Sequence, residues 1–278
     1  MKNARVLFIS QEITPYLPEN DISVIGRYLP QGIQDKGKEI RTFMPRFGSI
    51  NERRNQLHEV IRLSGMNLII SDTDHPLIIK VASIQSARMQ VYFIDNEDYF
   101  HRKNTLTEED GTQFADNDER MIFFARGVLE TVRKLRWVPD IVHCHGWFTA
   151  AAPLYVKKAF KEDPIFSNSK VVYSIYNDEF PGALAPGFKS KLITEGVRSK
   201  DVESLSAGGS WENITKLAIQ YSDAIIVGSQ TINPNISTYL EDVKKPIIGF
   251  EGSDTYIDAY SNLYDELIAS KATSVPKK

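Results

Sequence analysis

Val6-Leu7-Phe8-Ile9 is a run of four apolar residues near the start of the chain. A continuous apolar run of this length is typical of a β-strand that is buried on both faces, as in a parallel sheet. Similar short runs recur along the chain: Ile141-Val142, Val171-Val172-Tyr173-Ser174-Ile175, Ala224-Ile225-Ile226-Val227 and Ile247-Ile248. The chain therefore contains several candidate strands of the kind that a parallel sheet requires.

Helical patterns lie between these runs. From residue 119 to 135 the apolar residues recur largely at three- and four-residue spacing, and residues 149–160 and 212–221 also fit helices. Strands that alternate with helices indicate a parallel sheet covered on both faces. We therefore predict an α/β fold, a Rossmann-like parallel sheet flanked by helices, in a single domain that spans residues 1–270.

The middle of the chain has a different pattern, because candidate strands follow one another there with little helix between them. The four strands are residues 56–63, 66–70, 77–83 and 89–94. The run Ser71-Asp72-Thr73-Asp74-His75-Pro76 is rich in turn-forming residues and separates the second strand from the third. This pattern predicts a small β-meander inserted into the α/β domain at about residues 56–94.

Residues 254–270 predict a long closing helix, because three tyrosines and four aliphatic residues fall along one of its faces. That apolar stripe either docks on the helix's own domain or contacts a partner. Residues 271–278 are terminal and polar and contain Pro276, and we predict that they form a disordered tail.

Composition excludes several classes of protein. Hydrophobic residues make up 42% and charged residues 25% of the chain, which is enough for an ordinary buried core. Lys and Arg number 33 and Asp and Glu 36, and this net charge of −3 argues against a dedicated nucleic-acid binder. No window approaches the roughly 20 apolar residues of a membrane span, and the N-terminus lacks the pattern of a signal peptide. The expected location is cytoplasmic, with no membrane partner.

The largest group of candidate functional side chains lies in one stretch, Pro139-Asp140-Ile141-Val142-His143-Cys144-His145-Gly146-Trp147-Phe148-Thr149. A strand ends here and a helix begins, and open α/β sheets bind ligands at such carboxyl ends. Strand alternation puts His143 and His145 on one face and Cys144 on the other. His143 fits a hydrogen-bonded core histidine best, whereas His145 at the strand end is the better functional candidate. The remaining histidines lack ligand spacing, so no metal is predicted.

The same stretch resembles a segment of the glycogen and starch synthases, glucosyltransferases of the GT-B fold. That segment reads Asp-Ile-Val-His-Ala-His-Asp-Trp-His-Thr-Ala, and much of it recurs from Asp140 to Ala150. Other segments match the family in order: Pro45-Arg46-Phe47-Gly48-Ser49-Ile50, Val91-Tyr92-Phe93-Ile94-Asp95-Asn96, Asp116-Asn117 with Glu119-Arg120, and Tyr173-Ser174-Ile175-Tyr176-Asn177. The matches extend from about Val6 to Ser229, so the chain resembles the first domain of this family.

The resemblance implies a function in α-1,4-glucan metabolism. The family reaction transfers glucose from ADP-glucose or UDP-glucose to a glucan, with retention at the anomeric carbon. On this basis the candidate catalytic residues are His145 and Asp116, and the candidate substrate-binding residues are Trp147, Tyr176 and Asn177. Trp147 has a structural alternative, which is simple packing under the following helix. No cofactor is implied, because basic side chains and helix N-termini can stabilise a departing diphosphate.

The chain departs from the family in its donor-contacting loop, which in the family reads Lys-x-Gly-Gly-Leu. This chain has Pro18-Glu19-Asn20-Asp21-Ile22 there, so the lysine and both glycines are replaced. Glycines let the backbone approach phosphate, and the lysine supplies a countercharge. Pro18, Asn20 and Asp21 therefore mark a degenerate donor loop, and Glu19 and Asp21 are expected to repel a pyrophosphate. In addition, Gly146 and Phe148 replace an aspartate and a histidine of the family segment.

The expected length also differs from that of the family. GT-B enzymes hold the nucleotide-sugar between two Rossmann-like domains, and the second needs about 200 further residues. The part of the chain after Ser229 is much shorter, so we expect this chain to correspond to the first half of a synthase. Two hypotheses follow. The chain is part of an active glucosyltransferase, with a second-domain or synthase polypeptide in trans, or it is a non-catalytic relative that binds glucan or regulates a synthase. A nucleotide-binding protein unrelated to glucan is a third hypothesis.

Overall fold

The computed structural model describes residues 3–273. Its strands are β1 (Arg5–Ser10), β2 (Glu39–Pro45), β3 (His58–Glu59), β4 (Met66–Ile70), β5 (Thr73–Ile84), β6 (Met89–Asp95), β7 (Ile141–His145), β8 (Lys170–Ile175), β9 (Ala224–Val227) and β10 (Ile247–Ile248). Its α-helices are α1 (Asp21–Asp35), α2 (Glu52–Asn55), α3 (Glu97–Phe100), α4 (Asn117–Lys134), α5 (Ala151–Lys157), α6 (Phe188–Lys191), α7 (Trp211–Gln220), α8 (Pro234–Glu241) and α9 (Tyr256–Thr273). Short 3₁₀ helices are η1 (Gln85–Ala87), η2 (Trp147–Thr149) and η3 (Ser199–Leu205).

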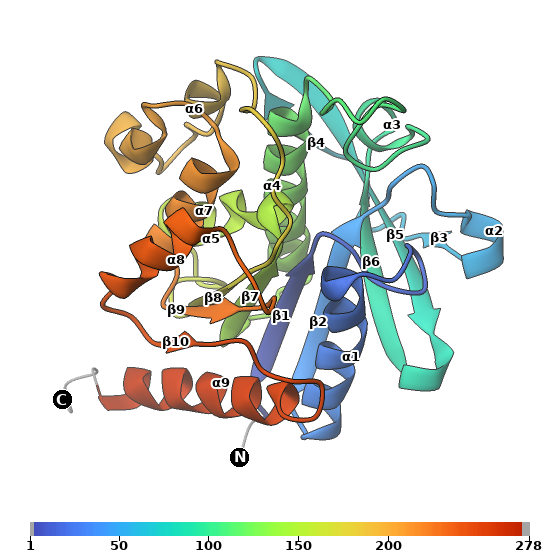
Figure 1. Cartoon of the computed structure of the whole chain (residues 1–278). Coiled ribbons are helices and arrows are strands. Elements are labelled where there is room, and N and C mark those ends of the chain that lie inside the picture. The colour runs from blue at the N-terminus through green and yellow to red at the C-terminus, as the bar shows by residue number, and fades with distance from the viewer. Residues whose placement is uncertain (1–2, 274–278) are drawn as a thin grey trace.

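One sheet organises the described residues, with the strand order β10-β9-β8-β7-β1-β2-β6-β5-β3 (Figure 1). Every pairing from β10 to β6 is parallel. In the centre, Phe8 of β1 faces Thr42 of β2 on one side and His143 of β7 on the other. Parallel neighbours must be joined by crossovers, and the helices of these crossovers cover both faces. The predicted Rossmann-like sheet flanked by helices is confirmed.

The strands of the middle segment differ from the prediction in their pairing. β6 pairs in parallel with β2, so it is a strand of the main sheet, and β5 pairs antiparallel with β6 at its edge. Only β3–β5 form the antiparallel attachment, with β3 and β4 both paired to β5. The first expected strand, residues 56–63, is reduced to His58–Glu59, because the chain turns where the Leu63 N–H bonds the Val60 carbonyl.

The expected break at residues 71–76 is shorter than predicted. Ser71 and Asp72 alone make the turn, with φ of 50° and 62°, and Ile70 already pairs with Thr73. Two residues with positive φ form the tight hairpin turn that matches the twist of paired strands. The rest of the turn-forming run, including Pro76, therefore lies inside β5.

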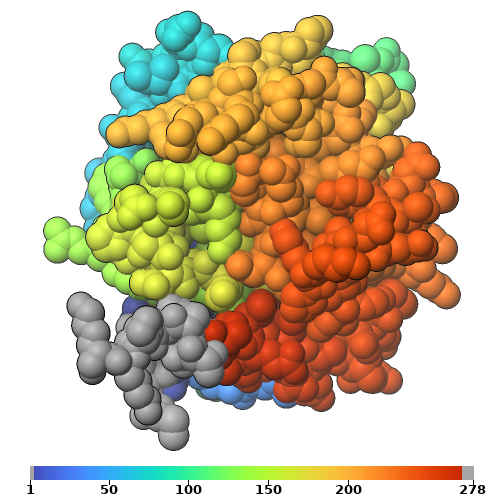
Figure 2. Space-filling model, turned by 90° about the vertical axis from the view of Figure 1, so that its left-hand side faces the viewer, coloured from blue at the N-terminus to red at the C-terminus, as the bar shows by residue number. Residues whose placement is uncertain are grey.

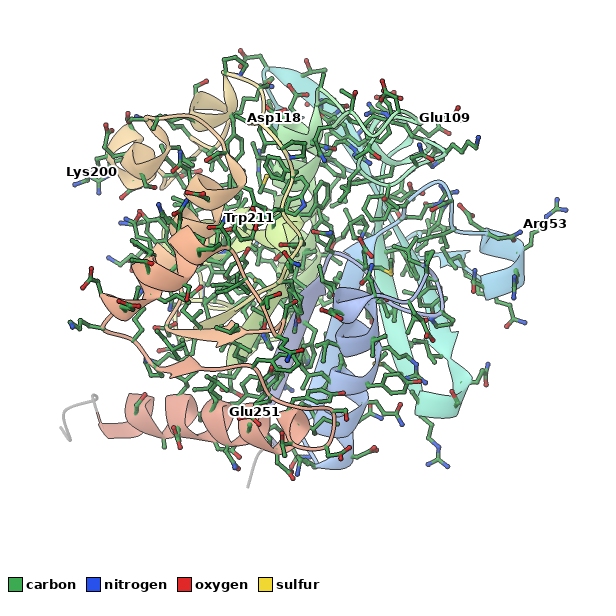
Figure 3. The ribbon with its side chains drawn as sticks, in the orientation of Figure 1. Arg53, Glu109, Asp118, Lys200, Trp211 and Glu251 are labelled. Atoms are coloured by element: carbon green, nitrogen blue, oxygen red, sulfur yellow. The ribbon has the colours of Figure 1, made fainter. Side chains whose placement is uncertain are left out.

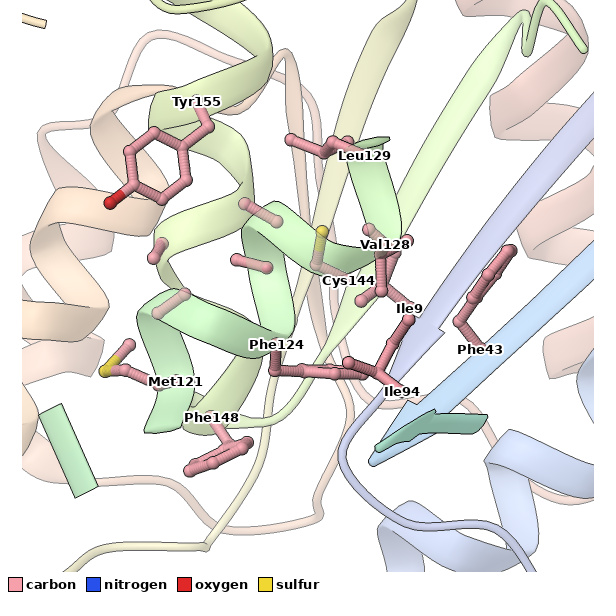
Figure 4. Packing of buried hydrophobic residues seen from close by; sticks show 14 of the residues in the cluster. Ile9, Phe43, Ile94, Met121, Phe124, Val128, Leu129, Cys144, Phe148 and Tyr155 are labelled. Atoms are coloured by element: carbon pink, nitrogen blue, oxygen red, sulfur yellow. The ribbon is translucent and has the colours of Figure 1, made fainter. Parts of the chain in front are cut away.

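The larger core lies between the sheet and the layer of α4, α5 and α7. Figure 4 shows part of it, where Phe124 and Val128 of α4 lie over Ile9 and Ile94 of the sheet. All four side chains are fully buried. The helix has the period predicted from sequence, and it begins at Asn117 rather than at residue 119.

The closing helix α9 docks on its own domain. It covers the opposite face of the sheet beside α1, and its buried side chains pack on apolar residues of β1, β7, β8 and β9. In the space-filling view its red atoms lie directly against the orange segment that precedes it (Figure 2). Among its described side chains, the buried apolar ones are Tyr256, Tyr260, Leu263, Tyr264 and Leu267. The helix continues to Thr273, three residues into the expected tail, and residues 274–278 lie outside the described residues.

Candidate functional site

A cleft of about 420 Å³ opens where the carboxyl ends of β1 and β8 meet the first turn of α1. We name it the carboxyl-end cleft. It is lined by Gln11, Glu12, Asn20, Asp21, Ile22, Tyr176, Asn177, Asp178 and Ser229. These residues are far apart in the sequence, and the order β9-β8-β7-β1 brings their strand ends to one edge of the sheet. This edge is where open α/β sheets bind ligands.

A second hollow of about 560 Å³ adjoins the cleft and shares Glu12 and Asn20 with it. Its other wall is formed by residues 103–111, in the loop between α3 and α4. Lys103 in this wall donates to Glu109 at 2.6 Å, and Glu109 lies at the outer edge of the molecule (Figure 3). The two hollows therefore border each other across Glu12 and Asn20.

The segment aligned with the family's donor loop caps α1. The Asn20 side chain accepts from the Ser23 N–H at 2.8 Å, and the Ser23 hydroxyl oxygen accepts from the Asn20 N–H at 2.9 Å. The Ser23 hydroxyl also contacts the Pro18 carbonyl oxygen at 2.9 Å. A helix N-terminus binds anions through N–H groups that are otherwise free. Here the side chains of Asn20 and Ser23 accept hydrogen bonds from N–H groups at the start of α1, so fewer of these N–H groups are available to a phosphate.

Carboxylates dominate the charge of the cleft. Glu12, Asp21 and Asp178 line it, and none of the described residues that line it is Lys or Arg. Ser229 donates to Asp21 at 3.0 Å and accepts from the Asn177 N–H at 3.1 Å. These bonds connect the segment after β9 to the start of α1 and to the segment after β8. Asp21 lines the cleft, whereas Glu19 does not, and the expected repulsion of a pyrophosphate stays a prediction.

Asp178 accepts hydrogen bonds from two N–H groups and has a raised pKa. It accepts from the Trp147 N–H at 2.9 Å and from the indole N–H of Trp211 at 3.0 Å, and Trp211 lies in the middle of the molecule (Figure 3). Burial raises the pKa of Asp178 to about 7, and the charge of Glu12 acts in the same direction. The carboxylate in the cleft therefore gains and loses its proton near neutral pH.

We expect this group to make stability depend on pH. The pKa of Asp178 rises from its ordinary value near 4 to about 7 on folding, so the folded state holds its proton more tightly. Its contribution to stability is complete below about pH 4 and is lost as the pH rises through about 7. Urea unfolding at intervals from pH 4 to 8 measures this. The unfolding free energy of the wild type should fall with pH relative to that of Asp178→Asn, and a constant difference would contradict the assignment.

His145 lies behind the cleft wall rather than in it. Its side chain is 1% exposed, and its Nδ1 is 2.8 Å from the hydroxyl of Tyr176, which lines the cleft. Burial lowers the pKa of His145 to about 3, so the imidazole is neutral at physiological pH. Its Nε2 has no hydrogen-bond partner among the described residues. The imidazole does not line the cleft itself but contacts the hydroxyl of Tyr176, which does. A catalytic role for His145 stays a prediction.

His143 is the hydrogen-bonded core histidine that the sequence favoured. Its Nδ1 is 2.6 Å from the Tyr264 hydroxyl of α9, and its Nε2 is 2.7 Å from the Ser174 hydroxyl. The rings of His143 and His145 are 3.9 Å apart on the same face of β7, and Cys144 faces the other core. Burial raises the pKa of the Cys144 thiol, which disfavours a thiolate nucleophile.

Trp147 and Asp116 lie outside both hollows. Trp147 is 2% exposed, and its ring centroid is 4.6 Å from that of Phe180, which lies in the loop after β8 and not in the following helix α5. Its role in binding substrate stays a prediction. Asp116 precedes α4 and makes an ion pair with Arg102 through both carboxylate oxygens. Of the candidate residues, the cleft brings together Asn20, Asp21, Tyr176 and Asn177.

Sequence reasoning missed Gln11, Glu12 and Asp178, which also line the cleft. The signal was present, because Gln11 and Glu12 directly follow β1 and Asp178 follows β8 by three residues. In residues 3–273, no cluster of His, Cys, Asp or Glu is arranged to hold a metal ion. None of the described helices is long and apolar enough to cross a membrane.

Comparisons with known proteins agree on one family. The family model of the starch synthase catalytic domain matches residues 5–254. The glycogen synthase of Chlorobium limicola is 34% identical over 263 residues, which cover 91% of this chain and 54% of that protein. The glycogen synthase of Chlorobium luteolum is 36% identical over 197 residues, covering 70% of this chain and 40% of that protein. The chain thus spans about half the length of the curated relatives that it matches.

A solved structure supports the fold. The catalytic domain of starch synthase IV from Arabidopsis thaliana, bound to ADP and acarbose, matches with a TM-score of 0.72 at 18% identity, over 90% of this chain and 51% of that one. That identity establishes the shared fold alone, whereas the family model covers most of the chain and includes the cleft. The chain belongs to the glycogen/starch synthase family of GT-B fold proteins.

Proposed function

We propose that this chain is a synthase-type protein of α-1,4-glucan metabolism whose carboxyl-end cleft binds glucan and, in isolation, binds sugar nucleotide weakly. The family reaction is the retaining transfer of glucose from ADP-glucose or UDP-glucose to a glucan, and we infer negligible transfer by this chain alone. It then acts as a glucan-binding or regulatory relative of a synthase. The observation that carries the proposal is the cleft wall of Glu12, Asp21 and Asp178 without a cation.

The electrostatics of the cleft favour a neutral ligand over a diphosphate. A diphosphate brings negative charge next to Glu12 and Asp21, and like charges at close range repel by about 1 to 4 kcal/mol in partly solvated surroundings. The cap made by Asn20 adds to this, because it satisfies an amide that would otherwise bind phosphate. A glucan has no charge, and its hydroxyls can donate to carboxylates and to the amide oxygen of Asn177.

Calorimetric titration and an activity assay test the proposal together. We expect the purified chain to show no micromolar affinity for ADP-glucose or UDP-glucose and to bind maltohexaose measurably. With radiolabelled ADP-glucose and glycogen, turnover should lie far below the roughly 1–1000 per second that enzymes reach. Micromolar binding of ADP-glucose, or turnover within that range, would contradict the proposal.

A variant that restores the family loop makes the test sharper. Pro18→Lys, Asn20→Gly and Asp21→Gly together add a cation, remove a carboxylate and free the amides at the start of α1. Affinity for ADP-glucose should rise about tenfold or more, the effect of roughly 1.4 kcal/mol. Glu59→Lys is the matched control, because it makes the same net charge change at an exposed position outside the cleft. An equal gain in both variants would assign the effect to net charge rather than to the loop.

A second candidate is an active glucosyltransferase whose donor site is completed by another polypeptide. Membership of the synthase family favours it, because curated relatives of about twice the matched length are glycogen synthases. In that case a second-domain or synthase polypeptide in trans supplies the cations that the cleft lacks. Glucose transfer that appears only when cell lysate is added to the purified chain, and that is lost in the Asp178→Asn variant, would support this candidate over the first.

A further inference from the structure

The turn between β7 and η2 has no side chain at its start, because residue 146 is glycine. Gly146 has φ of +84°, and a Cβ atom there would lie 2.9 Å from the Gln11 Oε1 atom and 3.2 Å from the Asp178 Oδ2 atom. Two side chains from the ends of other strands therefore fill the space beside this turn. Both of them also line the carboxyl-end cleft.

These two side chains accept hydrogen bonds from the main chain of the turn. The Asp178 Oδ2 atom accepts from the Trp147 N–H at 2.9 Å, and the Gln11 Oε1 atom accepts from the Phe148 N–H at 3.1 Å. The other Asp178 oxygen accepts from the indole N–H of Trp211, which is the first residue of α7 and is labelled in Figure 3, at 3.0 Å. One carboxylate thus connects the segment after β8 to the turn after β7 and to the start of α7.

Only the ionised form of Asp178 offers an acceptor to both N–H groups. A protonated carboxyl keeps one oxygen as a full acceptor, whereas its other oxygen carries the proton and becomes a donor. The N–H of Trp147 or the indole N–H of Trp211 then faces a donor instead of an acceptor. Burial raises the pKa of Asp178 to about 7, so both forms are populated near neutral pH.

The other charged and titratable groups around Asp178 come from several elements. Two further carboxylates line the cleft, Glu12 in the segment after β1 and Asp21 at the start of α1, and none of the described residues that line it is Lys or Arg. Burial moves the pKa of three nearby groups far from neutral and keeps them uncharged: Tyr173, Tyr176 and His145. The η2 and α7 helices present the two uncharged tryptophan N–H groups.

We propose that Asp178 is the positioning residue of the carboxyl-end cleft, because its ionised carboxylate fixes the turn at residues 146–148 and thereby the cleft side chains that receive a glucan. Gln11 is the link, since its side chain accepts from the Phe148 N–H and donates to Glu12 at 3.2 Å. The inference rests on the proposed function for the identity of the ligand, but not for the bonds that hold the turn.

This arrangement makes glucan affinity depend on pH. When Asp178 takes up a proton, one of its two bonds is lost, and Gln11 and Glu12 are held less firmly. A cleft that its ligand must first order binds that ligand more weakly. Glucan affinity therefore rises as the pH rises through about 7.

An NMR titration tests the two bonds without any ligand. In the wild type, the Trp147 amide and the Trp211 indole resonances should shift together with a midpoint near pH 7, and in Asp178→Asn neither should titrate there. Asp21→Asn is the matched control, because it removes a carboxylate from the same cleft but leaves both bonds of Asp178 in place, so both resonances should still titrate. Resonances that do not titrate in the wild type, or that titrate unchanged in Asp178→Asn, overturn the inference.

Calorimetry with maltohexaose at pH 5.5 and pH 8.5 measures the effect on the cleft. The wild type and Asp21→Asn should each bind about three- to tenfold more tightly at the higher pH, the effect of one hydrogen bond, whereas Asp178→Asn should bind equally at both. By linkage, saturating maltohexaose should lower the midpoint of the Trp211 resonance by about 0.5–1 pH unit. The same pH dependence in Asp178→Asn as in the wild type overturns the positioning role.

The two measurements separate this inference from the proposed function. If maltohexaose binds with an affinity that does not change with pH, glucan binding stands and the positioning role of Asp178 is overturned. If maltohexaose binds at neither pH while the Trp147 and Trp211 resonances titrate only when Asp178 is present, the proposed function fails and the positioning of the turn by Asp178 is supported.

Discussion

A chain that ends at Asp254, and so lacks α9, should aggregate or lose most of its thermal stability. Five α9 side chains, including Leu263 and Tyr264, are at most 7% exposed, and their partners on the sheet are fully buried. Burial of an aliphatic side chain is worth about 1.5–3 kcal/mol, so the helix contributes about as much as a typical total stability of 5–15 kcal/mol. Size-exclusion chromatography and thermal melts measure the result. A truncated chain that is soluble, monomeric and equally stable would show α9 to be an appendage.

Point variants locate the effect on the buried face of the helix. Leu263→Ala should cost about 2–5 kcal/mol, whereas Glu266→Ala on the exposed face should change stability by less than about 0.5 kcal/mol. Tyr264→Phe keeps the packing but removes the partner of His143 at 2.6 Å, which should cost about 1–3 kcal/mol. Equal effects of Leu263→Ala and Glu266→Ala would contradict docking through this face.

Arg120→Met should destabilise the chain by about 2–6 kcal/mol or more and release the loop that walls the second hollow. Methionine fills the space but leaves two main-chain carbonyls without donors, at about 1–3 kcal/mol each, and it also removes the donor to the Asn117 side-chain oxygen. Arg120 is fully buried, and it donates to the Tyr99 carbonyl at 2.7 Å and to the Thr105 carbonyl at 2.8 Å. Its guanidinium also lies 5.0 Å from the centre of the Phe114 ring, and burial lowers the pKa of Arg120 to about 9.

Urea unfolding gives the stability change, and limited proteolysis reports the loop at residues 101–113. Arg102→Met is the matched control, because Arg102 forms an ion pair with Asp116 that is partly exposed, and such pairs contribute about 1 kcal/mol or less. Arg120→Met should be cleaved in the loop much faster than Arg102→Met. If the two variants unfold at the same urea concentration, the buried guanidinium does not organise the loop.

The closing helix and the sheet show what local pattern can predict. The apolar runs at Val6 and Ala224 mark strands buried on both faces, and the apolar stripe of α9 marks a docking face. Both features depend only on residues that are close in the sequence, so they can be predicted without knowing the fold. The predicted length of the turn at residues 71–76 is wrong, because the turn itself consists of Ser71 and Asp72 alone. Turn-forming residues indicate that the chain turns, but they do not indicate how many of them form the turn.

The sequence by itself determined the α/β class, the closing helix and the resemblance to the synthases, because periodicity, burial and short motifs are local properties of the chain. Only the tertiary structure decided the charge of the cleft, the burial of His145 behind Tyr176 and the assignment of β6 to the main sheet. Glu12 and Asp178 are distant in sequence and meet at one edge because parallel strands pair out of sequence order. Strand order follows from the packing of whole crossovers, and no single segment encodes it.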